Sequence, residues 1–237
     1  MALNRRLRTL RFAQPFGRVN VDSMPTMISE RARARARTAP PDVKPCAIRQ
    51  ATADDVRTIA KLTYLAGGET FLFLLRELDP VAEPLRVYRD MIAAPTGMMS
   101  YRNCVVAVSR GQVVGAANAF PAGVIAEGID RETLTEREML LWPRTALNDP
   151  DSYFLNDIAV ARSHRRHGIG AALLRAVVDD ARRQAFPSVT LHVWADNAGA
   201  IALYRRFGFT EVGRAEIPWH AELPHTGGSL LLRLSCS

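Results

Sequence analysis

Cysteine is scarce in this chain: Cys46, Cys104 and Cys236 are the only three among 237 residues, and they lie far apart. Their spacing matches neither a disulfide framework nor a metal-ligand pattern, so we expect a reducing, cytoplasmic location. Apolar runs of about 18 residues, which a membrane-spanning helix needs, are also missing. Residues 10–21 lack the apolar core of a secretory signal, because two arginines and a proline interrupt them. We therefore predict no membrane association.

Surplus charge is absent from most of the chain. Residues 1–45 hold ten basic and three acidic residues, which accounts for the whole formal net charge of +7, and the rest carries 21 of each sign. Nucleic-acid-binding domains concentrate basic charge on a folded face, so nucleic acid is a disfavoured partner. Arginines alternating with alanine, followed by prolines, predict a disordered basic N-terminal extension over residues 1–45. A true start at Met24 or Met27, a functional basic arm and an organelle-targeting segment stay open alternatives.

Hydrophobic periodicity predicts one mixed α/β domain over residues 46–237. Strands are expected at residues 47–51, 104–108, 112–117, 154–160, 189–194, 209–215 and 229–234. Helices are expected from residue 56 to an interruption at residues 67–68, and then at 71–78, 169–186 and 198–207. An irregular insertion at residues 121–151 includes a helical part at 130–141, and such insertions are often functional in compact domains.

The strongest local feature is Arg165-Arg166-His167-Gly168-Ile169-Gly170, between a predicted strand and a long amphipathic helix. Its two glycines allow the backbone to turn tightly and to approach a ligand closely. The helix that follows directs free N–H groups and the positive end of its dipole at the same place. With two arginines beside them, these features predict a cradle for a diphosphate.

Three nucleotide-binding motifs compete for this segment. A Rossmann fingerprint needs glycine or alanine where Leu173 stands, and a P-loop needs a Gly-Lys-Ser/Thr run that is absent. The segment instead resembles motif A of the GNAT N-acetyltransferases, Gln/Arg-x-x-Gly-x-Gly/Ala. Arg165, Gly168 and Gly170 match its defining positions, and Val160 stands where the family has a valine at its strand end.

A second segment makes the resemblance specific. Residues 197–209 resemble motif B of the family, Asn-x-x-Ala-x-x-Leu-Tyr-x-x-x-Gly-Phe, at every named position, and residues 48–55 resemble a typical family opening. The resemblance covers residues 46–215 and implies the GNAT fold, a central mixed twisted sheet flanked by helices. It also implies an N-acetyltransferase that moves acetyl from acetyl-CoA, by direct attack, to a primary amine of a small molecule or a protein.

The same resemblance implies how acetyl-CoA is held. In the family, the donor-binding strand, here residues 154–160, splays from its neighbour, often at a bulge, and so frees backbone groups. The N–H of Ile158 would bind the acetyl oxygen, the backbone of Val160 would pair with the pantetheine arm, and Asn197 would bind that arm or cap its helix. The implied cofactor-binding residues are Ile158, Ala159, Val160, Arg165, Arg166, His167, Gly168, Ile169, Gly170, Asn197 and Tyr204.

Catalytic roles follow from the resemblance as well. Tyr204 stands at the position of the general-acid tyrosine, and a phenol carries its proton at neutral pH, as the role requires. A purely packing role for Tyr204 stays open. Asp157 is the expected general base, working through water with Asn156 orienting it, and the alternative is a carboxylate that braces the neighbouring strand.

Histidines and basic residues suggest other functions. His164 and His167 flank the cradle, but no cysteine or carboxylate accompanies them at ligand spacing, so no metal is expected. Two alternatives to the enzyme stay open: a catalytically inactive, acetyl-CoA-binding regulatory module, and a nucleic-acid-associated protein that docks through its basic tail. A homodimer is compatible with each function.

Overall fold

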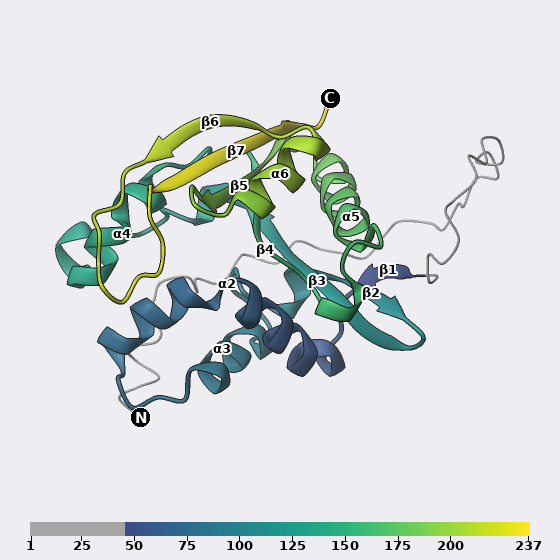
Figure 1. Cartoon of the computed structure of the whole chain (residues 1–237), viewed down its shortest axis with the longest axis horizontal. Helices are drawn as coiled ribbons and strands as arrows, with labels where there is room; N and C mark the ends of the chain where they lie inside the picture. The colour runs from purple at the N-terminus through teal and green to yellow at the C-terminus, as the bar shows by residue number, and fades with distance from the viewer. Residues whose placement is uncertain (1–45) are drawn as a thin grey trace.

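The computed structural model describes residues 46–237, so the predicted basic extension at residues 1–45 lies outside the described part. Within residues 46–237, seven strands form one sheet in the order β1-β2-β3-β4-β5-β7-β6 (Figure 1). The pair β4–β5 is parallel and the other neighbouring pairs are antiparallel. The strands are β1 (Ala47–Gln50), β2 (Cys104–Ser109), β3 (Gln112–Pro121), β4 (Tyr153–Val160), β5 (Ser188–Trp194), β6 (Thr210–Ala215) and β7 (Ser229–Ser235). The predicted mixed sheet is confirmed.

Helices cover both faces of this sheet (Figure 1). The helices are α2 (Val56–Leu78), α3 (Pro84–Ala93), α4 (Glu136–Ala146), α5 (Ile169–Arg183) and α6 (Ala198–Phe207). Side chains alternate along a strand, so Ala117 of β3 packs in the core under α5 and α6, while its neighbour Ala116 packs in the core under α2 and α3. The amphipathic pattern of α5 places Leu173, Leu174 and Val177 in the first of these cores.

The helix α2 corrects one prediction. It runs unbroken for 23 residues, so the interruption expected at residues 67–68 is wrong, and residues 71–78 belong to the same helix. Glycine costs about 1 kcal/mol in a helix but leaves the backbone hydrogen bonds intact. Position 68 has no room for a side chain, because a Cβ there would lie 2.7 Å from Cδ2 of Tyr64. The second helix before the β2–β3 hairpin is instead α3, whose first turn Glu83 caps by accepting hydrogen bonds from the N–H groups of Leu85 and Arg86.

Replacing Gly68 by alanine is expected to lower stability by about 1–3 kcal/mol, despite the better helix propensity of alanine. The added methyl group must displace the Tyr64 ring, which packs edge-on against Tyr88 and Phe71. Gly67→Ala is the matched control, because its methyl group would meet only Oδ1 of Asp157, at an ordinary 3.5 Å. Thermal unfolding should therefore rank Gly68→Ala below the parent protein, with Gly67→Ala at or above it; equal melting temperatures for the two variants would contradict the packing argument.

The helix in the insertion, α4, also differs from the expected range. It begins at Glu136 rather than residue 130, because Thr135 and Glu138 form a reciprocal capping box there. The Arg137 side chain then fixes α4 against α2 and the C-terminal segment, donating hydrogen bonds to the carbonyl oxygen of Phe73 (2.8 Å) and to Oε1 of Glu222 (2.7 Å). These contacts hold α4 beside the sheet at the C-terminal end of β5.

Two irregularities of β4 position the site. Asp157 pairs with Asn118 and Leu155 pairs with Ala119, so Asn156 is the extra residue of a β-bulge. The pairing of β4 with β5 covers only residues 153–155 of β4, and the two strands diverge beyond that point. The bulge and the splay that the family resemblance implies are therefore both present. Separately, none of the helices within residues 46–237 has the length and apolar character needed to cross a membrane.

Candidate active site

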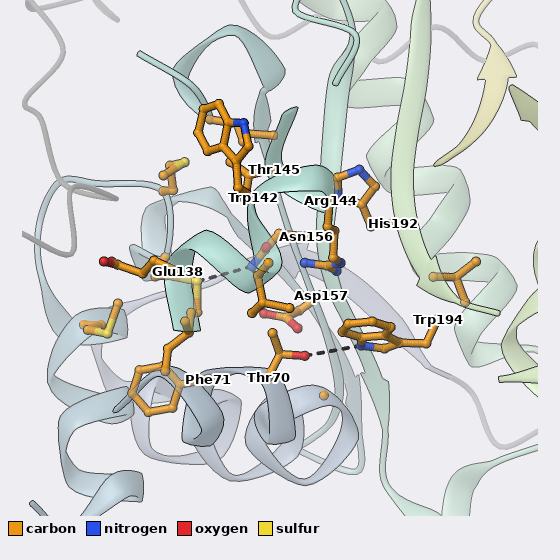
Figure 2. A pocket seen from close by; sticks show the side chains of 18 of the residues that line it. Thr70, Phe71, Glu138, Trp142, Arg144, Thr145, Asn156, Asp157, His192 and Trp194 are labelled. Atoms are coloured by element: carbon orange, nitrogen blue, oxygen red, sulfur yellow. Dashed lines mark hydrogen bonds between the residues drawn. The ribbon is translucent and has the colours of Figure 1, made fainter. Parts of the chain in front are cut away.

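A cavity of about 610 Å³ lies where β4 leaves β5, lined by residues of α2, α4, β4, β5 and α6 (Figure 2). Five residues predicted for the site line this cavity: Asn156, Asp157, Ile158, Asn197 and Tyr204. The others, Ala159, Val160 and residues 165–170, do not belong to its lining. The predicted catalytic residues thus share one space, and the predicted cradle is a separate feature at the start of α5.

The bulge brings two consecutive side chains to the cavity. In a regular strand Asn156 and Asp157 would point to opposite faces, but both line the cavity here. Oδ2 of Asp157 accepts hydrogen bonds from Nδ2 of Asn156 (2.9 Å) and from the hydroxyl of Tyr88 on α3 (3.1 Å). Asn156 therefore contacts the Asp157 carboxylate directly, and its role in orienting a general base stays a prediction.

The Asp157 carboxyl group has an unusual affinity for protons. Burial raises its pKa to about 6, and the hydrogen bond from Tyr88 and the positive charge of Arg144 reduce that effect only in part. A carboxylate with this pKa is mostly ionised at pH 7 and is far more basic than an ordinary aspartate. Both properties suit a general base.

Tyr204 supplies a proton donor to the same cavity. Its ring is 8% exposed and packs edge-on against Phe209, with the ring centroids 5.7 Å apart. Burial, followed by the negative charge of Asp157, raises the pKa of the Tyr204 hydroxyl well above the usual value for a phenol. The hydroxyl therefore stays protonated through the neutral range, as a general acid must.

Beyond Leu155, β4 presents backbone groups to the space that opens between β4 and β5. The N–H of Ala161 donates to the carbonyl oxygen of Val114 on the β3 side, so by alternation the N–H groups of Ile158 and Val160 face the β5 side. No strand within residues 46–237 pairs with β4 on that side beyond Leu155. The side chain of Arg165 reaches this edge, where its Nε donates to the carbonyl oxygen of Val160 (3.0 Å).

The glycine-containing loop has the shape of an anion cradle. Gly168 is the N-cap of α5, at φ +77°, and Arg166 has φ +64°, so both adopt the left-handed conformation that favours glycine. A Cβ added at Gly168 would meet nothing within 4 Å, and one at Gly170 would touch only Leu203 and Val160 at 3.9 Å. Packing within the described chain therefore does not require these glycines. Their missing side chains leave open space at the N-terminus of α5, the kind of place at which proteins bind anions.

Asn197 has a structural role that the sequence analysis left open. Its Oδ1 accepts a hydrogen bond from the N–H of Ala200 (3.1 Å), so it caps α6. The same residue lines the cavity, and its contact with a cofactor arm stays a prediction.

Residues of α4 and β5 complete the cavity wall, and sequence reasoning missed their part in the site. Nε2 of His192 lies 2.7 Å from the carbonyl oxygen of Leu147, and burial lowers the pKa of His192 to about 3, so its ring is neutral. Arg144 lies over the Trp194 ring, 5.4 Å from its centroid (Figure 2). One signal in the sequence could have pointed to Arg144. The Thr135-x-x-Glu138 capping box predicts the start of a helix, and that helix would carry Arg144 about two turns later.

Metal ligands do not gather in the described part of the chain. Within residues 46–237, no three His, Cys, Asp or Glu side chains form a group that could hold a metal ion.

Comparison with known proteins gives a consistent set of matches. The model of the acetyltransferase (GNAT) family matches residues 71–209. N-acetyltransferase family 8 member 3 of Rattus norvegicus is 31% identical over 165 residues, which cover 63% of each protein. The ribosomal protein bS18-alanine N-acetyltransferase of Escherichia coli (strain K12) is 41% identical over 61 residues, which cover 26% of this chain and 41% of that enzyme. The chain thus spans less than two thirds of the length of either relative.

A solved structure agrees with the match to the family. The crystal structure of an acetyltransferase superposes with a TM-score of 0.58 at 25% identity, covering 81% of this chain and all of that one.

Proposed function

The chain belongs to the acetyltransferase (GNAT) family, and on that premise we propose that it is an N-acetyltransferase that moves acetyl from acetyl-CoA to a primary amine. The observation that carries the proposal is the joint placement of Asp157 and Tyr204 in one cavity, at the point where β4 diverges from β5. One group is a carboxylate with a pKa of about 6, and the other is a phenol that keeps its proton. Acetyl transfer from a thioester to an ammonium ion can use such a pair, because the nitrogen loses two protons in all and the leaving thiolate gains one.

The donor would bind along β4 and the start of α5. The open N-terminus of α5 supports binding of its diphosphate by the loop Arg165, Arg166, His167, Gly168, Ile169 and Gly170. The outward backbone groups of β4 support β-like pairing of the pantetheine arm along residues 158–160, with Asn197 on the opposite side of the gap. This arrangement would put the reactive end of the donor in the cavity beside Ile158.

The side chains would then act in order. Asp157 accepts a proton from the incoming ammonium ion, directly or through water, so that the nitrogen lone pair attacks the thioester carbonyl. The N–H of Ile158 stabilises the carbonyl oxygen as negative charge grows on it, a contact worth about 3 kcal/mol at similar sites. Tyr204 donates its proton to the departing sulfur as the C–S bond breaks. The second proton of the attacking nitrogen, lost as the amide forms, restores the Tyr204 hydroxyl, and the proton on Asp157 leaves to water.

Two measurements test this function. Saturating acetyl-CoA should raise the melting temperature, and a panel of small amines and peptides should reveal an acceptor by release of the free thiol. No thermal shift at saturating acetyl-CoA would reject the proposal. A shift without turnover of any amine would favour the inactive binding module instead.

Replacing Tyr204 by phenylalanine is expected to lower kcat about 100-fold while the KM for acetyl-CoA changes little. The substitution removes the proton donor but keeps the ring that packs against Phe209, so the melting temperature should also change little. Tyr101→Phe is the matched control, because Tyr101 does not line the cavity. Steady-state thiol release at several acetyl-CoA concentrations separates kcat from KM. Wild-type kcat in Tyr204→Phe would leave Tyr204 with a packing role only.

A further inference from the structure

Arg144 is a half-buried cation that forms no ion pair within the described residues. Its Nε donates to Oγ of Ser229 (3.2 Å), and its guanidinium lies over the Trp194 ring. Within residues 46–237, no carboxylate oxygen lies within 4.0 Å of its nitrogens. It is among the residues that line the cavity, and burial lowers its pKa to about 10. Enclosing an unpaired guanidinium is costly, so the arrangement points to an anion that arrives with a ligand.

The surroundings of Arg144 hold its terminal nitrogens ready for such an anion. Ser229 fixes the Nε side of the guanidinium, and the indole of Trp194 fixes its plane. A planar guanidinium held in this way can bind a carboxylate through two parallel hydrogen bonds.

Asp157 lies on the same side of the cavity, and the two charges complement each other. Figure 2 shows the Arg144 guanidinium and the Asp157 carboxylate both directed into the cavity, with Trp194 beside them. They are not in ion-pair contact, but Arg144 is near enough for its charge to influence the Asp157 carboxyl group. A ligand with an ammonium group and a carboxylate on adjacent atoms would pair with both, the ammonium with Asp157 and the carboxylate with Arg144.

The rest of the cavity is largely apolar. Phe71, Leu74, Met98, Met99, Ile125 and Trp142 are among the side chains that line it. The Glu138 carboxylate, across the cavity from Arg144 in Figure 2, is already engaged because it accepts a hydrogen bond from the N–H of Thr135 (2.9 Å). The cavity therefore offers one zwitterion-binding corner and a large apolar region.

We propose that the acceptor is the α-amino group of a free amino acid with a large apolar side chain, and that Arg144 binds its carboxylate. This inference rests on the proposed acetyltransferase function and narrows its acceptor. A peptide N-terminus presents a neutral carbonyl group where the carboxylate would be, and a diamine would bring a second cation towards Arg144. Both are disfavoured on electrostatic grounds.

Substrate selectivity of the unmodified protein tests the proposal. L-phenylalanine, L-leucine and L-methionine would each be compared with their amides and their decarboxylated amines at saturating acetyl-CoA, by thiol release. We expect kcat/KM for the acids to exceed that for the other two series by about 100-fold. The amides have the less basic amino group, so amine basicity alone would favour them and cannot explain a preference for the acids.

The outcomes separate this proposal from the proposed function. Comparable turnover of acids, amides and amines would overturn the carboxylate site and leave acetyl transfer supported. Turnover of none of the nine compounds would also overturn the carboxylate site, and the thermal shift with acetyl-CoA and the wider amine panel would then judge acetyl transfer separately.

Arg144 variants add a second readout. In Arg144→Gln the preference for acid over decarboxylated amine should fall from about 100-fold to near unity, and Arg144→Lys should retain part of it because it keeps the charge without the planar fork. Arg89→Gln removes an exposed arginine of α3, whose ion-pair partner is its neighbour Asp90, and should keep the wild-type preference. A melting curve with acetyl-CoA checks that each variant is folded. Wild-type selectivity in a folded Arg144→Gln variant would overturn the assignment.

Discussion

Replacing Asp157 by asparagine is expected to lower kcat/KM for amine acetylation about 1000-fold while raising the melting temperature. Asparagine has nearly the same shape, and its side-chain oxygen can still accept the hydrogen bonds from Asn156 and Tyr88. It cannot remove a proton from the ammonium ion. It also removes a carboxylate whose charged form burial disfavours, which is why stability should increase. Steady-state kinetics and thermal unfolding of the same preparation measure both effects.

The pH profile identifies the same group. With a pKa of about 6 in the folded protein, Asp157 is protonated and inactive at lower pH, so kcat/KM should rise with pH up to about 6 and level off above it, until other groups titrate. Tyr88→Phe is the informative companion, because its lost hydrogen bond favours the charged carboxylate. Removing that bond should raise the pKa and shift the acidic limb to higher pH. A limb that stays in place in both Asp157→Asn and Tyr88→Phe would assign it to another group.

Stability should depend on pH in the opposite direction to activity. The folded-state pKa of Asp157 lies above the ordinary value of 3.8, so the folded protein binds more protons than the unfolded chain between about pH 4 and pH 6. The contribution of Asp157 to the free energy of unfolding therefore falls as pH rises through that window. In Asp157→Asn this contribution is absent, and comparing the two proteins by denaturant titration isolates it.

The cradle and the helix α6 were predictable because their signals are local. Glycines at 168 and 208 mark the two helix boundaries, where both adopt positive φ, and the apolar period of residues 169–183 marks the buried face of α5. The bulge at Asn156 was predictable only through the family resemblance, since nothing in residues 153–160 alone specifies where β4 leaves β5.

The raised pKa of Asp157 was beyond sequence reasoning because it arises from burial among elements that are distant in sequence. Tyr88, whose hydrogen bond partly offsets the effect of burial, precedes Asp157 by 69 positions and reaches it only because α3 packs beside the sheet. Glycine at position 68 depends in part on such a residue, since a Cβ there would clash with the Tyr64 ring one turn earlier on α2, and Tyr88 of α3 packs edge-on against that ring. In both cases α3 supplies a contact from outside the local sequence, and a pattern of residue types along the chain does not contain it.

The position of Arg144 in the cavity could not be predicted from the sequence either. On the sequence Arg144 is one arginine within an insertion of irregular pattern, and only the docking of α4 against α2 brings it to Trp194 and the cavity. The family motifs fall on the proposed donor side, whereas the proposed acceptor side depends on how this insertion packs. The acceptor therefore has to be inferred from charge and shape within the cavity.

Replacing Gly168 by glutamate is expected to abolish the stabilisation of the protein by acetyl-CoA. At 100 times its dissociation constant, a ligand stabilises the folded state by about 2.7 kcal/mol, which is about 5–10 °C in melting temperature for a protein of this size. A side chain at position 168 would enter the space at the N-terminus of α5, where no other atom of the described chain lies within 4 Å of a Cβ. Its carboxylate would be attracted to the free N–H groups and to Arg165, and so would occupy the diphosphate position itself.

Backbone strain must be separated from this competition, because Gly168 has φ +77° and any side chain there is strained. Gly111, in the turn between β2 and β3, provides the matched control: it has φ +74°, and a Cβ there also meets nothing within 4 Å. Gly111→Glu therefore carries the same strain and the same charge away from the cradle, and should keep the full thermal shift with acetyl-CoA. Gly168→Ala adds the strain at the cradle without the charge, so it should retain part of the shift. A full shift in Gly168→Glu would mean that the donor diphosphate binds elsewhere, whereas loss in both glutamate variants would point to strain or charge alone.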